Sequence, residues 1–108
     1  MSYSIKTIPS FDKQLKKLVI KHPSFKGEFL SFIKSLYENP LQGKSLGNQC
    51  YKIRIAIQSK GKGKSGGARI ISHILIQEET IYLITIYDKA DIDNITDFEI
   101  KKLIEQIA

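Results

Sequence analysis

Three segments with the composition of β-strands lie close together between residues 51 and 87, and this spacing constrains the fold more than any other feature. In residues 51–58, tyrosine and isoleucine occupy alternate positions, as in a strand with one buried face. Residues 68–77 and 80–87 form two more such segments, and the last is apolar on both faces. The pattern predicts an antiparallel meander of three strands, with the last strand in the interior of the sheet.

Two amphipathic helices are predicted before the meander. Apolar residues recur at helical spacing in residues 11–19 and again in residues 25–36. We expect Ser10 and Ser24 to be their N-caps, and a proline follows the end of each helix. Together they form a helical hairpin, preceded by a short strand over residues 2–8.

The last helix has the clearest local signature. Thr96 and Glu99 have the spacing of a capping box, and the residues from Ile100 onward form an apolar stripe. The predicted order is therefore strand, helix, helix, three strands, helix. This order predicts an α+β fold in one domain over residues 1–108, with helices packed on one face of the sheet and the opposite face partly open.

Positive charge is concentrated in the middle of the chain. The net charge is +6, but residues 39–77 alone contain seven lysines and arginines and no acid. Residues 78–108 have a net charge of −5. A concentrated basic stripe favours a polyanionic partner such as a nucleic acid, although a solvated basic face is the alternative explanation.

Several classes of site and compartment are not indicated. The one cysteine, Cys50, cannot form an internal disulfide, and no Cys/His cluster suggests a metal site. The first residues lack the apolar core of a signal peptide, and no apolar run approaches the length of a membrane span. We therefore expect a cytoplasmic protein that uses no metal or cofactor and does not bind a membrane.

Residues 61–66 contain two motifs that imitate nucleotide sites. They match GxGxxG, but a dinucleotide site requires a helix after the glycines, and residues 68–71 have the composition of a strand. Gly63-Lys64-Ser65 imitates the end of a P-loop, but Gln58 stands where the first glycine is required. We expect neither nucleotide site.

The strand pattern predicts a cationic cleft on the sheet face away from the helices. Lys52 and Arg54 project from the same side of one strand, and Arg69 begins the next. Lys89 follows the third strand and is expected to close the cleft. These four are the candidate catalytic residues. The residues expected to contact a nucleic acid bound in this cleft are Lys60, Lys62, Lys64, Tyr87 and His73.

A cationic cleft without a carboxylate base or a metal site is compatible with RNA cleavage. The 2′-OH of RNA can itself attack the adjacent phosphate. Catalysis then requires in-line positioning of the nucleotide and neutralisation of the charge on the phosphorane. A desolvated lysine among other cations has a lowered pKa, so it can also move protons.

These segments resemble the RelE/ParE toxin superfamily, and most closely its HigB-like branch. The resemblance is carried by Tyr51–Ala56, by the KGKGK-S-GG-A-R-I-I pattern of Lys60–Ile71 and by Tyr82–Lys89. The order of the helices and strands extends it over nearly the whole chain. The resemblance implies a toxin of a type II toxin–antitoxin system, an mRNA interferase that enters the ribosomal A site and cuts the exposed codon.

The resemblance also implies residue roles and partners. Lys52, Arg54, Arg69 and Lys89 match basic residues of the family's site by position. Some members carry a further tyrosine near the C-terminus. Residues 93–96 contain none, so the general base stays unassigned. The implied partners are messenger RNA, the ribosome and a cognate antitoxin with an acidic patch, for which a helix-turn-helix is typical of HigB-like systems.

Two other functions stay open from the sequence. One is a ParE-like toxin that inhibits DNA gyrase, and the other is a noncatalytic module that binds nucleic acid. Single residues also have structural alternatives. Arg69 could pair with Asp88 or Asp91, and Tyr87 and His73 could be sheet residues without a functional contact.

Overall fold

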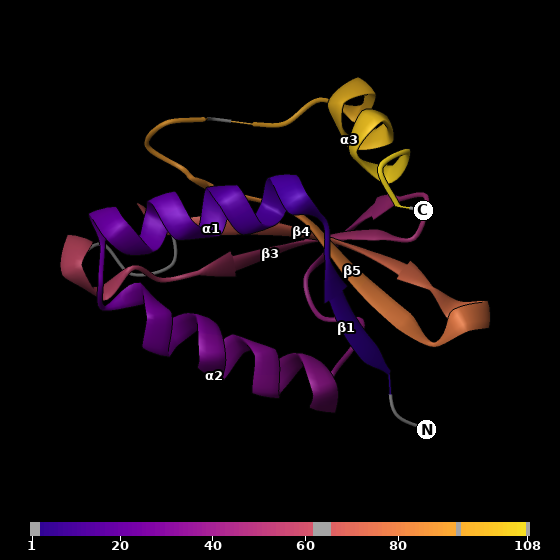
Figure 1. The fold of residues 1–108 in the computed structure, drawn as a ribbon, viewed down its shortest axis with the longest axis horizontal. Helices are drawn as coiled ribbons and strands as arrows, with labels where there is room; N and C mark the ends of the chain where they lie inside the picture. The colour runs from indigo at the N-terminus through magenta and orange to yellow at the C-terminus, as the bar shows by residue number, and fades with distance from the viewer. Residues whose placement is uncertain (1–2, 62–65, 93, 108) are drawn as a thin grey trace.

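The computed structural model describes residues 3–61, 66–92 and 94–107. The helices and strands follow in the order β1 (Ser4–Thr7), α1 (Pro9–Lys21), α2 (Phe25–Glu38), β2 (Lys44–Gly47), β3 (Cys50–Ile55), β4 (Ala68–Leu75), β5 (Thr80–Asp88) and α3 (Asp97–Ile104) (Figure 1). Short 3₁₀ turns cover Gln58–Lys60 and Ile76–Glu78. The α+β class, the helical hairpin, the meander and the C-terminal helix are all confirmed.

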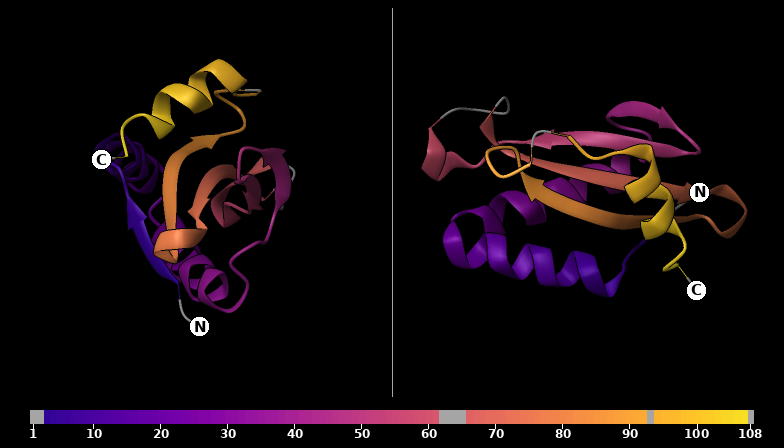
Figure 2. Two further views of the ribbon diagram at one scale, coloured as in Figure 1. Left: turned by 90° about the vertical axis from the view of Figure 1, so that its right-hand side faces the viewer. Right: turned by 90° about the horizontal axis from the view of Figure 1, so that it is seen from above.

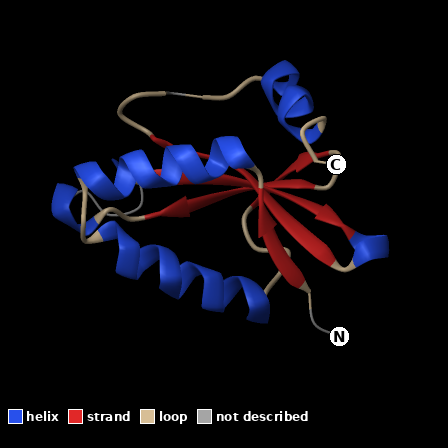
Figure 3. Cartoon of the chain, viewed as in Figure 1, coloured by secondary structure: helices blue, strands red, loops and turns tan. Residues whose placement is uncertain are grey.

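The strands form one mixed sheet in the order β1-β5-β4-β3-β2 (Figure 3). The pairs β3–β4 and β4–β5 are antiparallel, as predicted, and β5 lies in the interior of the sheet. On its other side β5 pairs with β1 in parallel, and this pairing ends at Leu83 of β5. The apolar composition of β5 on both faces follows from this interior position.

The two faces of the sheet have different neighbours. Ile53, Ile70 and Ile86 are directly paired across three strands and buried on one face, where α1 and α2 pack. Figure 2 shows α3 on the other side of the sheet from α2. The expected open face is thus covered over part of its area by α3, whose residue Ile100 joins the core.

Of the three predicted N-terminal caps, only that of α3 is formed by side-chain hydrogen bonds. The capping box of α3 is present, because Thr96 Oγ1 accepts from Glu99 N and the Glu99 carboxylate accepts from Thr96 N. The prediction of Ser10 as a cap is wrong. Pro9 begins α1 instead, since its fixed φ suits the first helical position. Ser24 precedes α2 but makes no side-chain cap.

Candidate functional site

A row of three side chains crosses the sheet on the face opposite α1 and α2. The strand register places Arg54 of β3 directly opposite Arg69 of β4, and Arg69 directly opposite Tyr87 of β5. Directly paired residues of antiparallel strands have Cβ atoms about 4.5–5.5 Å apart. The sheet therefore brings together two of the four candidate catalytic residues, and we call this set the arginine row.

Lys52 lies one step along the same face from Arg54, and the structure adds a neighbour that sequence reasoning did not select. Lys44 of β2 is paired directly with Lys52. Burial lowers the pKa of the Lys52 ammonium, and the charges of Lys44, Arg54, Arg69 and Lys89 lower it further. The other three candidate catalytic residues thus all act electrostatically on Lys52.

Lys44 was missed because its strand was missed. Residues 41–49 contain two glycines and were expected to form a loop, yet β2 pairs with β3 there. Gly43 makes the pairing of β2 with β3 possible. Its φ is +105°, and a Cβ at this position would lie 2.6 Å from the Lys52 carbonyl oxygen, so only glycine fits. The sequence feature that could have identified Lys44 as a site residue is the absence of acids around it. The result is a groove at the edge of the sheet, lined by Gln42, Gly43, Lys44, Lys52, Ile53 and Arg54.

The two arginines of the row differ in exposure. Arg54 is exposed, whereas Arg69 is only 3% exposed and its guanidinium donates a hydrogen bond of 3.2 Å to the Ala68 carbonyl. Burial and the charge of Arg54 lower the pKa of Arg69, against an opposing effect of Tyr87. Arg69 is therefore held in place by its surroundings, and Arg54 is the arginine that solvent and ligands reach freely.

Lys60 is engaged in a different cluster from the arginine row. Its ammonium donates to Asp88 Oδ1 at 2.6 Å, and Ala90 N donates to the same oxygen at 2.9 Å. His22 lies beside them, with Nε2 3.8 Å from Asp88 Oδ2 and Nδ1 2.9 Å from Ser59 Oγ. We call Lys60, Asp88, His22 and Ser59 the Asp88 cluster.

The Asp88 cluster holds the beginning of the loop between β3 and β4, residues 59–67, which we call the Lys/Gly loop, to the end of β5. Burial alone would raise the pKa of the Asp88 carboxyl. The hydrogen bonds from Lys60 and Ala90, together with the charges of Lys60 and Lys21, outweigh burial and lower that pKa. Lys60 thus has a structural role, whereas Lys62 and Lys64 lie outside the described residues.

Two other residues expected to contact RNA are buried. Tyr87 is 6% exposed and His73 is 7% exposed. His73 lies toward the opposite end of β4 from Arg69, with its Nδ1 3.3 Å from the Cys50 sulfur. Burial lowers the pKa of His73 and raises that of Cys50 to about 11, so the pair is uncharged at neutral pH. These environments favour structural roles for both residues.

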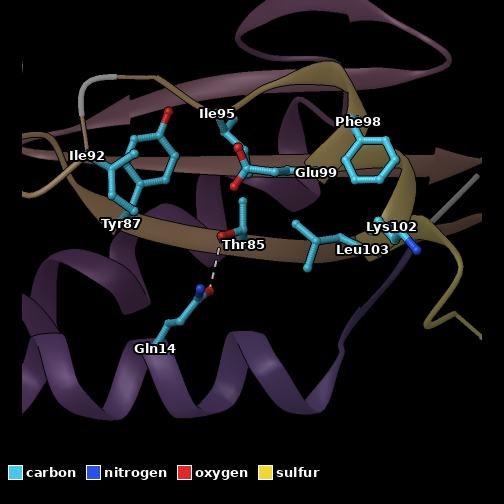
Figure 4. Close-up of a pocket in the computed structure, with 9 residues that line it drawn as sticks. All are labelled: Gln14, Thr85, Tyr87, Ile92, Ile95, Phe98, Glu99, Lys102 and Leu103. Carbon is cyan, nitrogen blue, oxygen red and sulfur yellow. Dashed lines mark hydrogen bonds between the residues drawn. The ribbon is translucent and has the colours of Figure 1, made fainter.

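Tyr87 lines a pocket beside β5, together with residues of α1, of α3 and of the segment before α3 (Figure 4). Gln14 reaches it from α1, and its Oε1 accepts from Thr85 Oγ1 at 3.1 Å and from Ile86 N at 3.2 Å. The pairing of β1 with β5 ends at Leu83. Gln14 therefore accepts the hydrogen bond of the Ile86 backbone N–H, for which β1 supplies no acceptor. The other lining residues are Ile92, Ile95, Phe98, Glu99, Lys102 and Leu103.

Two searches of the described residues bear on cofactors and membranes. Within the described ranges, no three His, Cys, Asp or Glu side chains are grouped so that they could hold a metal ion. No helix among these residues is long and apolar enough to cross a bilayer. The chemistry available at the arginine row is that of cations acting on an anionic ligand.

Comparison with known proteins agrees with this fold. Residues 10–108 match the family model of the RelE toxin of the RelE/RelB toxin–antitoxin system. A free double arginine-to-alanine mutant of E. coli RelE is similar over 100% of both chains, with a TM-score of 0.62 and 14% identity. A crystal structure of isolated E. coli RelE is similar over 98% of this chain and 99% of its own, with a TM-score of 0.49 and 14% identity. A metal-bound toxin from Helicobacter pylori is similar over 83% of this chain and 98% of its own, with a TM-score of 0.46 and 20% identity.

Proposed function

The chain belongs to the RelE toxin family, and from this premise we propose that it is a ribosome-dependent endoribonuclease that cleaves messenger RNA. As a toxin of a toxin–antitoxin system it has a cognate antitoxin. The observation that carries the proposal is the direct pairing of Arg54 with Arg69, next to Lys52 and on the sheet face opposite α1 and α2. A concentrated set of cations on a rigid sheet suits a phosphate whose charge increases during reaction.

The proposed reaction is attack of an RNA 2′-oxygen on the adjacent phosphorus. The bond from phosphorus to the 5′-oxygen breaks, leaving a 2′,3′-cyclic phosphate and a 5′-hydroxyl. Arg54 and Arg69 stabilise the negative charge of the phosphorane, and one well-placed donor of this kind contributes about 10²–10³ in rate. No metal takes part in this scheme.

Lys52 is the residue best suited to move a proton. Its pKa is lowered by burial and by four neighbouring cations, which brings its proton affinity closer to the range useful at neutral pH. We assign it proton transfer at the 2′-oxygen or the leaving 5′-oxygen. Lys44 and Lys89 then hold the flanking phosphates and set the pKa of Lys52.

Ribosome dependence is tested with purified protein in three reactions. The substrates are messenger RNA alone, the same RNA on ribosomes with the A site empty, and supercoiled DNA with gyrase. We expect cuts within the A-site codon in the second reaction only, mapped by primer extension. Equal cutting of free RNA would remove the ribosome from the proposal. Inhibited supercoiling without RNA cleavage would replace the proposal with a gyrase-directed toxin.

A further inference from the structure

The turn that follows β5 carries Lys89, one of the four candidate catalytic residues, and Asp88 holds this turn together. Asp88 is the last residue of β5 and is buried. Its Oδ1 accepts a hydrogen bond of 2.9 Å from Ala90 N. Its backbone oxygen accepts from Asp91 N at 3.0 Å and from Ile92 N at 3.1 Å. Three consecutive amides after Lys89 therefore bond to one residue, and they close the turn of residues 88–92.

The backbone of Lys89 is also bonded to the residue before β4. Its N–H donates a hydrogen bond of 3.1 Å to Gly67 O. A Cβ on Gly67 would collide with the Ile55 carbonyl oxygen, so Gly67 lies directly against the end of β3. The backbone at Lys89 is therefore fixed relative to the two strands that carry Lys52 and the arginines of the arginine row.

An ion pair sets the direction of the Asp88 carboxylate. Lys60 Nζ donates to Oδ1 at 2.6 Å, and the two side chains are only 15% and 2% exposed. His22 Nε2 lies 3.8 Å from Oδ2, which is beyond hydrogen-bond distance. Among the described residues, Lys60 is therefore the side chain that fixes this carboxylate, through a charge-assisted bond that is largely shielded from water.

The ion pair and the residue whose backbone it fixes act on opposite faces of the sheet. Asp88 and Lys60 meet beside His22, which ends α1 on the helical face. Lys89 acts on the other face, because burial lowers the pKa of Lys52 and the charge of Lys89 lowers it further. A bond on the helical face thus determines where a cation lies on the face of the arginine row.

We propose that Asp88, held by Lys60, is a positioning residue for RNA cleavage and acts by placing the ammonium of Lys89 beside Lys52. This inference rests on the proposed function and adds to it a residue that does not touch the substrate. Loss of the Asp88 carboxylate leaves Lys89 in the chain but removes the bonds that fix its turn. A displacement of about 1 Å in a group that contacts the substrate can slow a reaction about 10²-fold.

A double-mutant cycle in single-turnover cleavage on saturated ribosomes tests this route of action. Asp88→Ala should slow cleavage about 10–100-fold at a temperature where the variant is fully folded, with ribosome affinity nearly unchanged. In a Lys89→Gln background the same substitution should slow cleavage by less than about 2-fold, because the group that Asp88 places is already absent. Equal fold losses in both backgrounds, or a wild-type rate in folded Asp88→Ala, would overturn the proposal.

Conservative variants and a second pair keep the cycle decisive. Asp88→Asn retains an oxygen for Ala90 N and should lose less rate than Asp88→Ala. Lys60→Arg keeps the ion pair and should cut at nearly the wild-type rate, whereas Lys60→Gln should cut slowly. If Asp88→Ala does not fold, Lys60→Gln takes its place in the cycle with Lys89→Gln, and the same comparison applies.

Glu28→Gln is the matched control. Glu28 Oε1 accepts from Gln58 N at 3.0 Å, so this carboxylate bonds the segment next to Lys60 to α2 and not to β5. Its replacement should leave the cleavage rate unchanged in both backgrounds. A loss as large as that of Asp88→Ala would show that any weakening of this segment slows cleavage, which contradicts a specific role for Asp88.

Hydrogen exchange separates this inference from the proposed reaction. The amides of Ala90, Asp91 and Ile92 should exchange faster in Asp88→Ala than in the wild type, and Glu28→Gln should leave them unchanged. Unchanged protection of these amides in Asp88→Ala would overturn the proposal at any rate of cutting. If the wild-type protein cuts nothing, the proposed reaction fails, and exchange still decides whether Asp88 fixes the turn that carries Lys89.

Discussion

Arg69 and its neighbours show how strongly the surroundings of single residues shape this site. Burial lowers the pKa of Arg69, and the charge of the neighbouring Arg54 lowers it further, against an opposing effect of Tyr87. Such an arrangement is unfavourable for folding and is typical of sites that bind an anion.

The pKa of Lys52 gives a test at this scale. Lys44→Gln removes one of the charges that lower it, so the pKa of Lys52 should rise. Whether Lys52 acts in its charged or neutral form, the inflection of the pH–rate profile that it controls should shift to higher pH. Single-turnover cleavage on saturated ribosomes measures this shift. Lys6→Gln, on β1, is the charge-matched control, and an identical shift in both variants would contradict the assignment.

Gly43 tests the contact that positions Lys44. Gly43→Ala combines a positive φ with a Cβ that would lie 2.6 Å from the Lys52 carbonyl oxygen, so β2 must move away from β3. Strain of this kind costs about 1–3 kcal/mol of unfolding free energy. Urea denaturation should detect the loss. Gly27→Ala is a suitable control, because nothing lies within 4 Å of its added Cβ.

At the scale of elements, the Asp88 cluster ties the Lys/Gly loop to β5 and to the turn between α1 and α2. Lys60 and Asp88 are both largely buried where they meet. The loop thus begins from a fixed point, although Lys62 and Lys64 lie outside the described residues. We expect the cluster to contribute to stability more than an exposed ion pair does.

The cluster should make stability depend on pH in a defined direction. The pKa of Asp88 is lower in the folded protein than its ordinary value, so its stabilisation is complete above that ordinary value and is lost as pH falls through the folded pKa. Asp88→Asn should reduce the unfolding free energy at pH 7 by about 1–3 kcal/mol and flatten its decline below pH 4. Denaturation across pH tests this. If the unfolding free energy of Asp88→Asn declines below pH 4 as steeply as that of the wild type, other groups cause the acid sensitivity and the prediction is wrong.

Elements with a strong local pattern were predictable from the sequence, and elements that depend on distant contacts were not. The capping box and the alternation of β3 identify α3 and β3 without further information. β2 has only four residues, it follows Gly43 and ends in Gly47, and it exists because β3 offers an edge to pair with. The start of α1 was misplaced because a cap signal at Ser10 competes with Pro9 at the first helical position.

For the whole molecule, the sheet separates two surfaces of different character. One face carries the core under α1 and α2, while the other carries the arginine row and α3. Sequence alternation predicted that Arg54 and Lys52 share a face and that Arg69 lies beside them on the next strand. The register places Arg69 directly opposite Arg54 and adds Lys44, which the sequence analysis had not selected. The burial of Tyr87 and His73 was not predictable, because it depends on how α3 and the segment before it cross the sheet.

The ion pair of Lys60 with Asp88 predicts which lysines of the Lys/Gly loop govern ribosome affinity. Lys60 is committed to Asp88, so Lys62 and Lys64 are the loop lysines we expect to contact phosphates. Their double replacement by Gln should flatten the slope of log affinity against log salt by up to about 1.4, from about 0.7 per single-strand phosphate contact. Sedimentation with ribosomes across a salt series measures it. Lys13→Gln/Lys17→Gln on α1 should leave the slope unchanged, and equal effects of both pairs would argue for unspecific charge.

The central claim is that the arginine row stabilises the transition state, and Arg54→Gln tests it most directly. Arg54 is exposed, so its replacement opens no cavity and should leave the thermal unfolding midpoint unchanged. We expect single-turnover cleavage on saturated ribosomes to slow about 10²–10³-fold, with ribosome affinity nearly unchanged. A folded Arg54→Gln protein that cuts at the wild-type rate would contradict the account.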